Sequence, residues 1–284
     1  AQPIYGYSGY ALKDTKFQTI LLRAKEDVYT HLSGGNLSRI LGEGYDFAEL
    51  QEYQPTDDIR HISWVNSAKL GKTYVKKMHE ERELNITVCS LIDGRMVIGD
   101  KQELLSYIVA LLGYSAYSAN DLFGAISIFG SDIKEYEPTK NIEVIEQSIY
   151  DIYDFEPLGK SINYAEVPSK LMQTIEAKSL LFIIGDFLDD IDLSILSQKH
   201  EVVAVIVRDT WEENPIASPN AQLINPQTNR AINQTLSIRA IREYRSKLLE
   251  HDNRLIKQLN SYNIRYAKVY NIDEVIGKFN KSIL

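Results

Sequence analysis

The strongest constraint on this chain is a regular alternation of short apolar runs and longer amphipathic runs that begins near residue 84. The apolar runs cover residues 86–92, 124–129, 180–184, 202–207 and 265–269, lengths typical of buried strands. The runs with helical spacing cover residues 101–118, 141–153, 162–175, 191–198, 236–260 and 273–279. Short buried strands separated by helices predict an α/β protein with a mainly parallel sheet and helices on both faces.

Polar residues follow the predicted strands at three places. Asp93 comes directly after the first strand, Asp186 comes after the third, and Ser161 lies in a Gly-Lys-Ser turn before a helix. Ligands of parallel sheets bind beyond the carboxyl ends of the strands, so we expect these side chains to lie near one another. Carboxylates and hydroxyls are ligands that Mg²⁺ takes, but aspartates in such places also cap loops and helices.

The residues before the predicted sheet have a different pattern of apolar and polar residues. Residues 13–32 have apolar positions at helical spacing, and a Gly-rich segment that would end the helix follows. The side chains of residues 73–78 alternate as they do in a strand. Between them, the stretch from Gly42 to Trp64 mixes acids and aromatic rings without a clear period. We interpret it as an irregular, ordered cap in which Tyr45, Phe47, Tyr53 and Trp64 supply packing area.

Composition excludes some classes of function. The formal net charge of −8 disfavours general binding to nucleic acid or to anionic membranes. The single cysteine, Cys89, lies in an apolar run and is expected to be a small core residue in a reducing compartment. Apolar runs do not approach the length of a membrane span, so we expect no membrane insertion and a cytoplasmic location.

The front motif resembles the signature of domain-of-unknown-function family 58. Its residues are Gly42, Gly44, Phe47, Tyr53, Asp57, Asp58, Arg60 and Trp64. In that family such a module precedes a von Willebrand factor A-like body with a Rossmann-like, three-layer arrangement. The resemblance therefore implies a module at residues 1–83, built from a helix and an irregular β element, and a von Willebrand A-type domain at residues 84–284.

The strand-end residues are similar to the metal-ion-dependent adhesion site of von Willebrand A domains. That family has an Asp-x-Ser-x-Ser loop, whereas this chain has Asp93 followed by Gly94-Arg95-Met96-Val97, so both serines are missing. A guanidinium beside Asp93 competes with a cation. We expect a degenerate site in which Arg95 replaces the metal charge by pairing with Asp93, Asp186 or both. Mg²⁺ or another divalent cation on Asp93, Ser161 and Asp186 stays open as the alternative.

The resemblance implies a non-enzymatic adaptor that works with a MoxR-type AAA+ ATPase in protein maturation or complex assembly. Asp93, Arg95, Ser161 and Asp186 would form the docking surface, which the 42–64 segment would stiffen or extend. The chain has no complete Gly-rich phosphate loop, because position 154 is aspartate where such a loop has glycine. No cofactor is expected.

Two other functions stay open. A metal-dependent hydrolase would use Asp93 and Asp186 with Asp189 or Asp190, or a cluster of Asp57, Asp58 and His61. A scaffold with a vestigial site would use the helix at 236–260 as its contact surface. That helix carries an apolar stripe expected to pack on the sheet, with members Ile238, Ile241, Leu248, Leu249, Leu255, Ile256 and Leu259.

Overall fold

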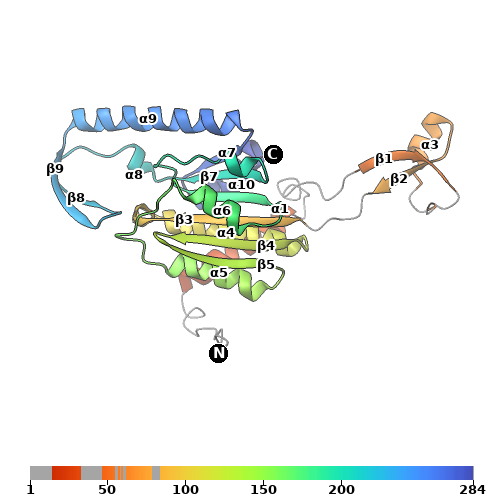
Figure 1. Cartoon of the computed structure of the whole chain (residues 1–284), viewed down its shortest axis with the longest axis horizontal. Coiled ribbons are helices and arrows are strands. Elements are labelled where there is room, and N and C mark those ends of the chain that lie inside the picture. Colours follow the sequence, from red (N-terminus) through yellow and green to blue (C-terminus); the bar gives the residue numbers. More distant parts are fainter. Residues whose placement is uncertain are drawn as a thin grey trace.

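A mainly parallel sheet of six strands forms the centre of the protein (Figure 1). The computed structural model describes residues 15–32, 47–54, 57, 59, 62–78 and 84–283. The strands of the central sheet are β3 (Asn85–Ile92), β4 (Leu122–Phe129), β5 (Asp132–Thr139), β6 (Leu180–Gly185), β7 (Glu201–Val207) and β10 (Arg265–Val269). Their order is β10-β7-β6-β3-β4-β5, and only β5 is antiparallel to its neighbour. The predicted α/β class and its parallel sheet are confirmed.

The strand order places the first strand of the sheet in its middle. Strands β4 and β5 follow in order on one side of β3. Strand β6 then pairs with the other side of β3, and β7 and β10 follow beyond it. The order therefore reverses between β3 and β6. In doubly wound sheets this reversal opens a crevice at the carboxyl ends of the two strands.

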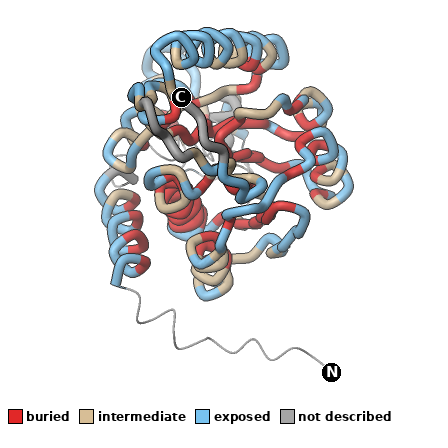
Figure 2. Tube along the Cα trace, turned by 90° about the vertical axis from the view of Figure 1, so that its left-hand side faces the viewer, coloured by how far each residue is buried: buried red, intermediate tan, exposed pale blue. Residues whose placement is uncertain are grey.

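Helices cover both faces of the sheet. One face packs against α4 (Lys101–Ser118), α5 (Ile142–Asp154) and α10 (Val275–Ser282), and α1 (Thr15–Leu32) lies against α4. The other face packs against α6 (Val167–Thr174), α7 (Ser194–Ser197) and part of α9 (Ile238–Ser261). Figure 2 shows the buried positions gathered in the sheet and in the helices next to it. Each face thus has its own apolar core.

Helix α4 explains why α1 belongs to this arrangement. Residues of α4 from Leu104 to Ala116 are buried around its whole circumference, so the helix needs cover on the side that faces away from the sheet. Helix α1 provides it with Phe17, Ile20, Leu21, Ala24 and Val28, which are all buried. The first helix, grouped with residues 1–83 in the sequence analysis, therefore packs in the core of the α/β body.

The predicted helix at residues 162–175 is shorter than expected. Helix α6 begins at Val167, with Pro168 in its first turn, and residues 162–166 are irregular. Proline fits the first turn of a helix because the amide that it lacks would have no partner there. The predicted helix at 191–198 is likewise reduced to α7, and the predicted helix at 273–279 is replaced by η4 (Ile272–Glu274) and α10.

The front module projects from the body in Figure 1. Its described part contains β1 (Phe47–Glu52) antiparallel to β2 (Tyr74–Met78), with α3 (Trp64–Leu70) before β2. Strand β2 matches the predicted strand at 73–78. Trp64 is 71% exposed and α3 has no buried residue, so the expectation that Trp64 packs is wrong. Among the residues that the structure describes, no second layer covers the apolar side chains of this short helix.

A second hairpin lies at the opposite end of the molecule, beyond the carboxyl ends of the strands (Figure 1). It consists of β8 (Ser218–Asn225) and β9 (Arg230–Leu236), which pair antiparallel, and the short helix α8 (Thr210–Glu213) precedes it. The Asn225 side chain accepts hydrogen bonds from the backbone N–H groups of Gln227 and Thr228 and so shapes the turn. Helix α9 follows, capped by the Ser237 hydroxyl.

Candidate functional site

Asp93 and Asp186 lie on either side of the point where the strand order reverses. Asp93 directly follows β3, Asp186 directly follows β6, and these two strands are neighbours. Both side chains are 0% exposed. Asp93 caps the short helix η3 (Gly94–Val97) by accepting a hydrogen bond of 2.9 Å from the backbone N–H of Arg95. That cap turns the Arg95 side chain back toward the sheet edge.

Arg95 joins the two aspartates. Its Nη2 lies 2.7 Å from Asp93 Oδ2, and its Nε lies 3.0 Å from Asp186 Oδ2. Nη2 also donates to Asp189 Oδ2, 2.7 Å away on the loop after β6. The predicted pairing of Arg95 with both strand-end acids is confirmed.

Two residues that the sequence analysis did not predict also donate hydrogen bonds to the Asp93 carboxylate. Tyr164 donates its hydroxyl hydrogen to Asp93 Oδ2 at 2.9 Å, and the Gln227 amide donates to the same oxygen at 2.9 Å. Burial, followed by the charges of Asp186 and Asp93, raises the pKa of Tyr164, so its hydroxyl stays a donor. Gln227 comes from the tip of the β8–β9 hairpin, which therefore reaches the strand-end acids.

A buried lysine lies behind Asp186. Lys101, the first residue of α4, is 1% exposed; its Nζ lies 2.6 Å from Glu212 Oε1 and 3.6 Å from Asp186 Oδ2. Burial raises the pKa of Glu212, Lys101 opposes that rise, and Asp186 adds to it. Arg95 and Lys101 thus hold Asp186 from two sides, which fits the rule that buried charges are paired.

The Arg95 guanidinium is charged and is not fully enclosed. Burial alone would lower the pKa of Arg95, but the charges of Asp186 and Asp93 outweigh it and raise the pKa above the ordinary value. Arg95 is 12% exposed and lines a cleft between the hairpin and α9. Among the described residues, the hydrogen bonds of Arg95 come from Nε and Nη2, and none comes from Nη1. The arginine is therefore fixed on one side and open on the other.

The hairpin tip fits closely on the loop after β3. An added Cβ on Gly94 would lie 1.9 Å from the Pro226 carbonyl oxygen, which is far inside contact distance. The same oxygen accepts a hydrogen bond of 2.7 Å from the Gly159 N–H, and Gly94 N–H donates to the Lys160 carbonyl at 2.8 Å. Only glycine allows this approach of three backbone segments.

The loop after β6 carries backbone strain next to Asp186. Phe187 is 0% exposed and has a φ of 50°, which is in the left-handed region that a bulky residue rarely adopts. The Arg208 guanidinium holds this loop by donating from Nε to the Asp186 carbonyl at 2.6 Å, and the His251 ring contacts the Phe187 carbonyl at 2.8 Å. Strain of this kind gathers at functional sites, where the surroundings enforce it.

Ser161 forms no hydrogen bond with Asp93, Arg95 or Asp186 in the described structure. It is exposed and lines a separate pocket of about 480 Å³ with Gly130 and Asn163, and Tyr164 supplies the hydroxyl to Asp93 instead. The set Asp93, Ser161 and Asp186 is a poor fit for a cation, because the Arg95 guanidinium lies between the two carboxylates. Within the described ranges, no group of three or more His, Cys, Asp or Glu side chains is arranged so that it could hold a metal ion.

The front-module residues lie away from the cluster or outside the described residues. Gly42, Gly44, Asp58, Arg60 and His61 are outside the described residues, and Phe47 is described only as the start of β1. Tyr53 donates its backbone N–H to the Thr73 carbonyl, and Asp57 accepts from the Gln54 backbone. The module precedes β3 and lies at the other end of the strands from Asp93, so it does not extend that surface (Figure 1).

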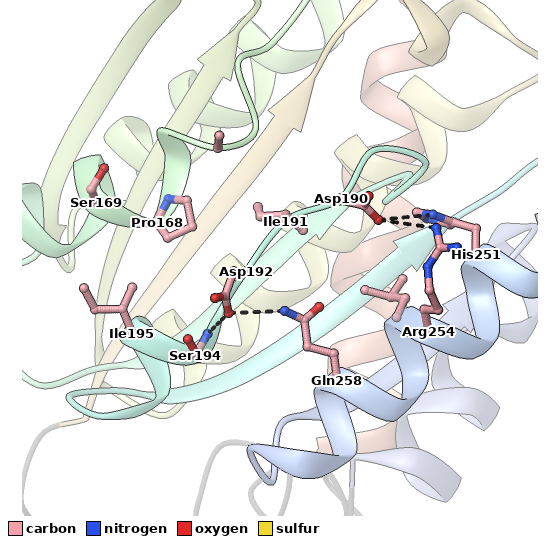
Figure 3. Close-up of a pocket in the computed structure, with 12 residues that line it drawn as sticks. Pro168, Ser169, Asp190, Ile191, Asp192, Ser194, Ile195, His251, Arg254 and Gln258 are labelled. Atoms are coloured by element: carbon pink, nitrogen blue, oxygen red, sulfur yellow. Dashed lines mark hydrogen bonds and ion pairs between the residues drawn. The ribbon is translucent and has the colours of Figure 1, made fainter.

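A second pocket lies farther along the same face of α9 and shares His251 and Arg254 with the first (Figure 3). Its volume is about 720 Å³, and Figure 3 shows Asp190 directed toward His251 and Arg254, at 3.5 and 3.9 Å. Asp192 accepts from Ser194 N–H at 2.9 Å and from Gln258 at 3.2 Å. The hydrogen bonds from Ser194 lower the pKa of Asp192. Asp190, one of the acids considered for hydrolysis, therefore faces α9 and not Arg95.

Comparison with known proteins places the chain in a family. The family model described as "Protein of unknown function DUF58" matches residues 49–254, and the chain belongs to this family. Three relatives, the uncharacterized proteins Mb1516 of Mycobacterium bovis and MT1527 and Rv1480 of Mycobacterium tuberculosis, are each 24% identical over 210 residues. The match covers 68% of this chain and 64% of each relative, so the chain spans less than two thirds of their length.

Two solved structures are similar over most of their length. They are the conserved hypothetical protein BatB from Bacteroides thetaiotaomicron and an aerotolerance-related membrane protein from Bacteroides fragilis, each 12% identical. The match with BatB covers 70% of this chain and 96% of the BatB chain, with a TM-score of 0.39. The match with the aerotolerance-related protein covers 70% of this chain and 98% of that protein's chain, with a TM-score of 0.41. Likeness at these TM-scores supports no argument about function. As for membranes, the described helices include none with both the length and the apolar character of a span.

Proposed function

We propose that this protein is a non-enzymatic adaptor whose strand-end site docks a partner protein by binding a carboxylate of that partner at Arg95. The observation that carries this proposal is the open edge of Arg95. Buried acids hold the guanidinium in place, Arg95 lines the cleft, and its hydrogen bonds among the described residues come from Nε and Nη2. A pre-positioned guanidinium binds carboxylates strongly because little freedom is lost on binding.

Asp189 occupies part of the position that a partner carboxylate would take. It is 47% exposed, unlike Asp93 and Asp186, and bonds to Arg95 at 2.7 Å. An exposed side chain can turn away at small cost. In this proposal Asp189 covers Arg95 in the free protein and gives way, at least in part, when the partner binds.

The body is proposed to be a von Willebrand factor A-like domain with a degenerate metal-ion-dependent adhesion site. Support comes from the strand order and from the aspartates after β3 and β6. The resemblance stated in the sequence analysis makes a MoxR-type AAA+ ATPase the partner to test, in protein maturation or complex assembly. We keep the cytoplasm as the proposed location.

The direct test is binding of the purified MoxR-type ATPase from the same genome, with nucleotide present, by isothermal titration calorimetry. We expect saturable binding to the wild type and tighter binding, by about threefold to tenfold, to Asp189→Asn, because the competing carboxylate is gone. Glu137→Gln is the matched control, since Glu137 is an exposed acid in the middle of β5. Absence of binding to the wild type, or equal affinities for Asp189→Asn and wild type, would contradict the proposal.

The hydrolase alternative has less support. Asp93 and Asp186 are bound to Arg95, and Asp190 faces His251 and Arg254. A screen with generic phosphate and ester substrates and Mg²⁺ or Mn²⁺ tests it. We expect no turnover above the Asp186→Ala background, and metal-dependent turnover abolished by that substitution would favour the enzyme.

A further inference from the structure

The first half of α9 has an apolar face that the sheet does not cover. The sequence analysis expected the whole apolar stripe of this helix to pack on the sheet, and this is wrong for its first half. Leu255 and Leu259 are the buried residues of α9, whereas Ile241 and Leu248 of the same face are only partly buried and Tyr244 is 41% exposed. The helix extends beyond the carboxyl ends of the strands, on the side where α8 and the β8–β9 hairpin lie (Figure 1).

This part of α9 and the β8–β9 hairpin form the two walls of a cleft, which we name the hairpin cleft. Its volume is about 780 Å³. Ile241, Tyr244 and Leu248 line it from α9, where spacings of three and four residues place them on one helix face. Leu223 and Leu236 of the hairpin line it from the other side. Both walls are thus apolar and partly exposed.

The charged residues that line the hairpin cleft are mostly basic. Arg95, Lys247 and Arg254 line it, and Glu212 is the one acid among the lining residues that the structure describes. Glu212 is 5% exposed and bound to Lys101, so it presents little negative charge. Lys247 forms no ion pair with any described residue, whereas Arg254 has long contacts of 3.8 and 3.9 Å with two exposed acids. Arg95 is paired with three aspartates, so the positive charge that the cleft presents comes mainly from Lys247 and Arg254, on a chain of net charge −8.

We infer that the hairpin cleft binds an amphipathic, acidic peptide segment of a partner protein, with apolar side chains between α9 and the hairpin and carboxylates on Arg95, Lys247 and Arg254. The inference builds on the docking role proposed above and names the chemistry of the docked segment. The pocket of Figure 3 differs, since Asp190 and Asp192 line it and disfavour an acidic segment.

The spread of the basic residues favours a peptide over a small anion. Lys247 and Arg254 are seven positions apart on α9, about 10 Å along the helix axis, and Arg95 lies at the strand ends. A single carboxylate with an apolar tail reaches one of them, whereas a segment with several acids reaches all three. The α9 wall from Ala240 to Arg254 is about 21 Å long, which a helix of about 14 residues matches.

Selection from a displayed library of random peptides of about 16 residues tests the inference without the ATPase. We expect the selected peptides to combine Leu, Ile, Phe or Trp with Asp or Glu. Their affinity, measured by fluorescence polarisation, should fall at least about tenfold in Leu248→Asp and little in Leu249→Asp. The matched pair suits the geometry, because Leu248 lines the cleft and the adjacent Leu249 does not. Both positions are partly or well exposed, so both variants are expected to fold.

A second pair of variants tests the charge. Lys247→Glu should weaken the same peptides by about tenfold, whereas Arg245→Glu should change little, because Arg245 does not line the cleft. Selection of no peptides, selection of basic peptides, or equal loss in Leu248→Asp and Leu249→Asp would overturn the inference. So would stoichiometric binding of oleate in the absence of peptide binding. A failed ATPase titration with successful peptide selection would reject the named partner and retain the cleft.

Discussion

Arg95 and Arg208 both lie at strand ends and both pair with acidic side chains, but they differ in their exposure. Arg208 follows β7 and its side chain is 0% exposed; it donates to the Asp186 carbonyl at 2.6 Å and to Asp252 of α9 at 2.8 Å. Arg95 is 12% exposed, and its hydrogen bonds and ion pairs with described residues come from Nε and Nη2. One arginine is enclosed, and the other presents an edge to a cleft.

The difference separates the structural role of Arg208 from the binding role proposed for Arg95. Arg208 ties the β6 loop to α9, and Lys268 of β10 extends the network by pairing with Asp252 and Glu213. Removal of Arg208 therefore affects the positions of several elements. Arg95 is held by the structure more than it holds the structure together, since Lys101 also faces Asp186 and Tyr164 also bonds to Asp93.

The largest effect is expected for Arg208→Leu. Asp252 loses one of its two basic partners, and the Asp186 carbonyl loses the donor Arg208, whose side chain is 0% exposed, so the free energy of unfolding should fall by about 3 kcal/mol. Urea denaturation followed by circular dichroism measures it. Arg239→Leu is the control, because Arg239 is 89% exposed and pairs only within α9, with an expected loss under about 0.5 kcal/mol. Equal losses in the two variants would remove the distinction between enclosed and exposed arginines.

Asp252→Asn tests the same network through pH. Burial alone would raise the pKa of Asp252, but Lys268 and Arg208 outweigh it and lower the pKa below its ordinary value. The unfolded state then binds more protons in this range, so the stability from Asp252 is present above about pH 4 and is lost as the pH falls through the lowered pKa. At neutral pH the free energy of unfolding of Asp252→Asn should be about 2 kcal/mol lower than that of the wild type. This difference should become smaller below about pH 4.

Urea midpoints between about pH 3 and pH 7 give the Asp252→Asn comparison. Asp132→Asn, an exposed aspartate at the start of β5, serves as the control and should follow the wild type. A gap between wild type and Asp252→Asn that stays constant over this range would show that the Asp252 charge is not stabilised by its basic neighbours.

Gly94→Ala should displace the hairpin tip from the strand-end site. The added Cβ would collide with the Pro226 carbonyl, and we expect a loss of about 1–2 kcal/mol with faster amide hydrogen exchange in residues 218–236. Gly277→Ala is the matched control in α10, where an added Cβ meets nothing within 4 Å; alanine should be neutral or stabilising by about 1 kcal/mol. Unchanged exchange in the hairpin of Gly94→Ala would contradict the close fit.

The smallest effect is expected for Tyr164→Phe, which removes the hydroxyl between Asp93 and Arg95. Asp93 keeps its bonds from Arg95 and Gln227, so the free energy of unfolding should fall by only about 1 kcal/mol. Differential scanning calorimetry measures it. A loss as large as that of Arg208→Leu would mean that Tyr164, and not Arg95, is the main partner of Asp93.

The sequence predicted those parts of the site that follow from strand ends alone. Asp93 and Asp186 could be placed together because parallel strands end at one edge, and Arg95 could be paired with them because it lies two residues from Asp93. Tyr164 and Gln227 could not, because their contacts with Asp93 span 71 and 134 positions along the chain. Lys101 resembles a surface residue at the start of a helix, and only the approach of α8 buries it.

The missed strands have a common physical cause. Strand β5 lies at the edge of the sheet and is mostly exposed, so it lacks the apolar run by which the other strands were found. The β8–β9 hairpin lies outside both cores, and its polar sequence gave no strand period. The Asn225-Pro226 pair was a turn signal that could have indicated it.

The most direct test of the account compares Arg95→Lys with Arg208→Lys, each titrated with the MoxR-type ATPase at a temperature where both variants are folded. Lysine keeps the charge and removes the planar fork of donors. The account predicts that Arg95→Lys loses at least about tenfold in affinity with little change in stability, whereas Arg208→Lys loses stability and keeps its affinity. Equal affinity for wild type and Arg95→Lys would contradict the claim that the open edge of Arg95 is the docking site.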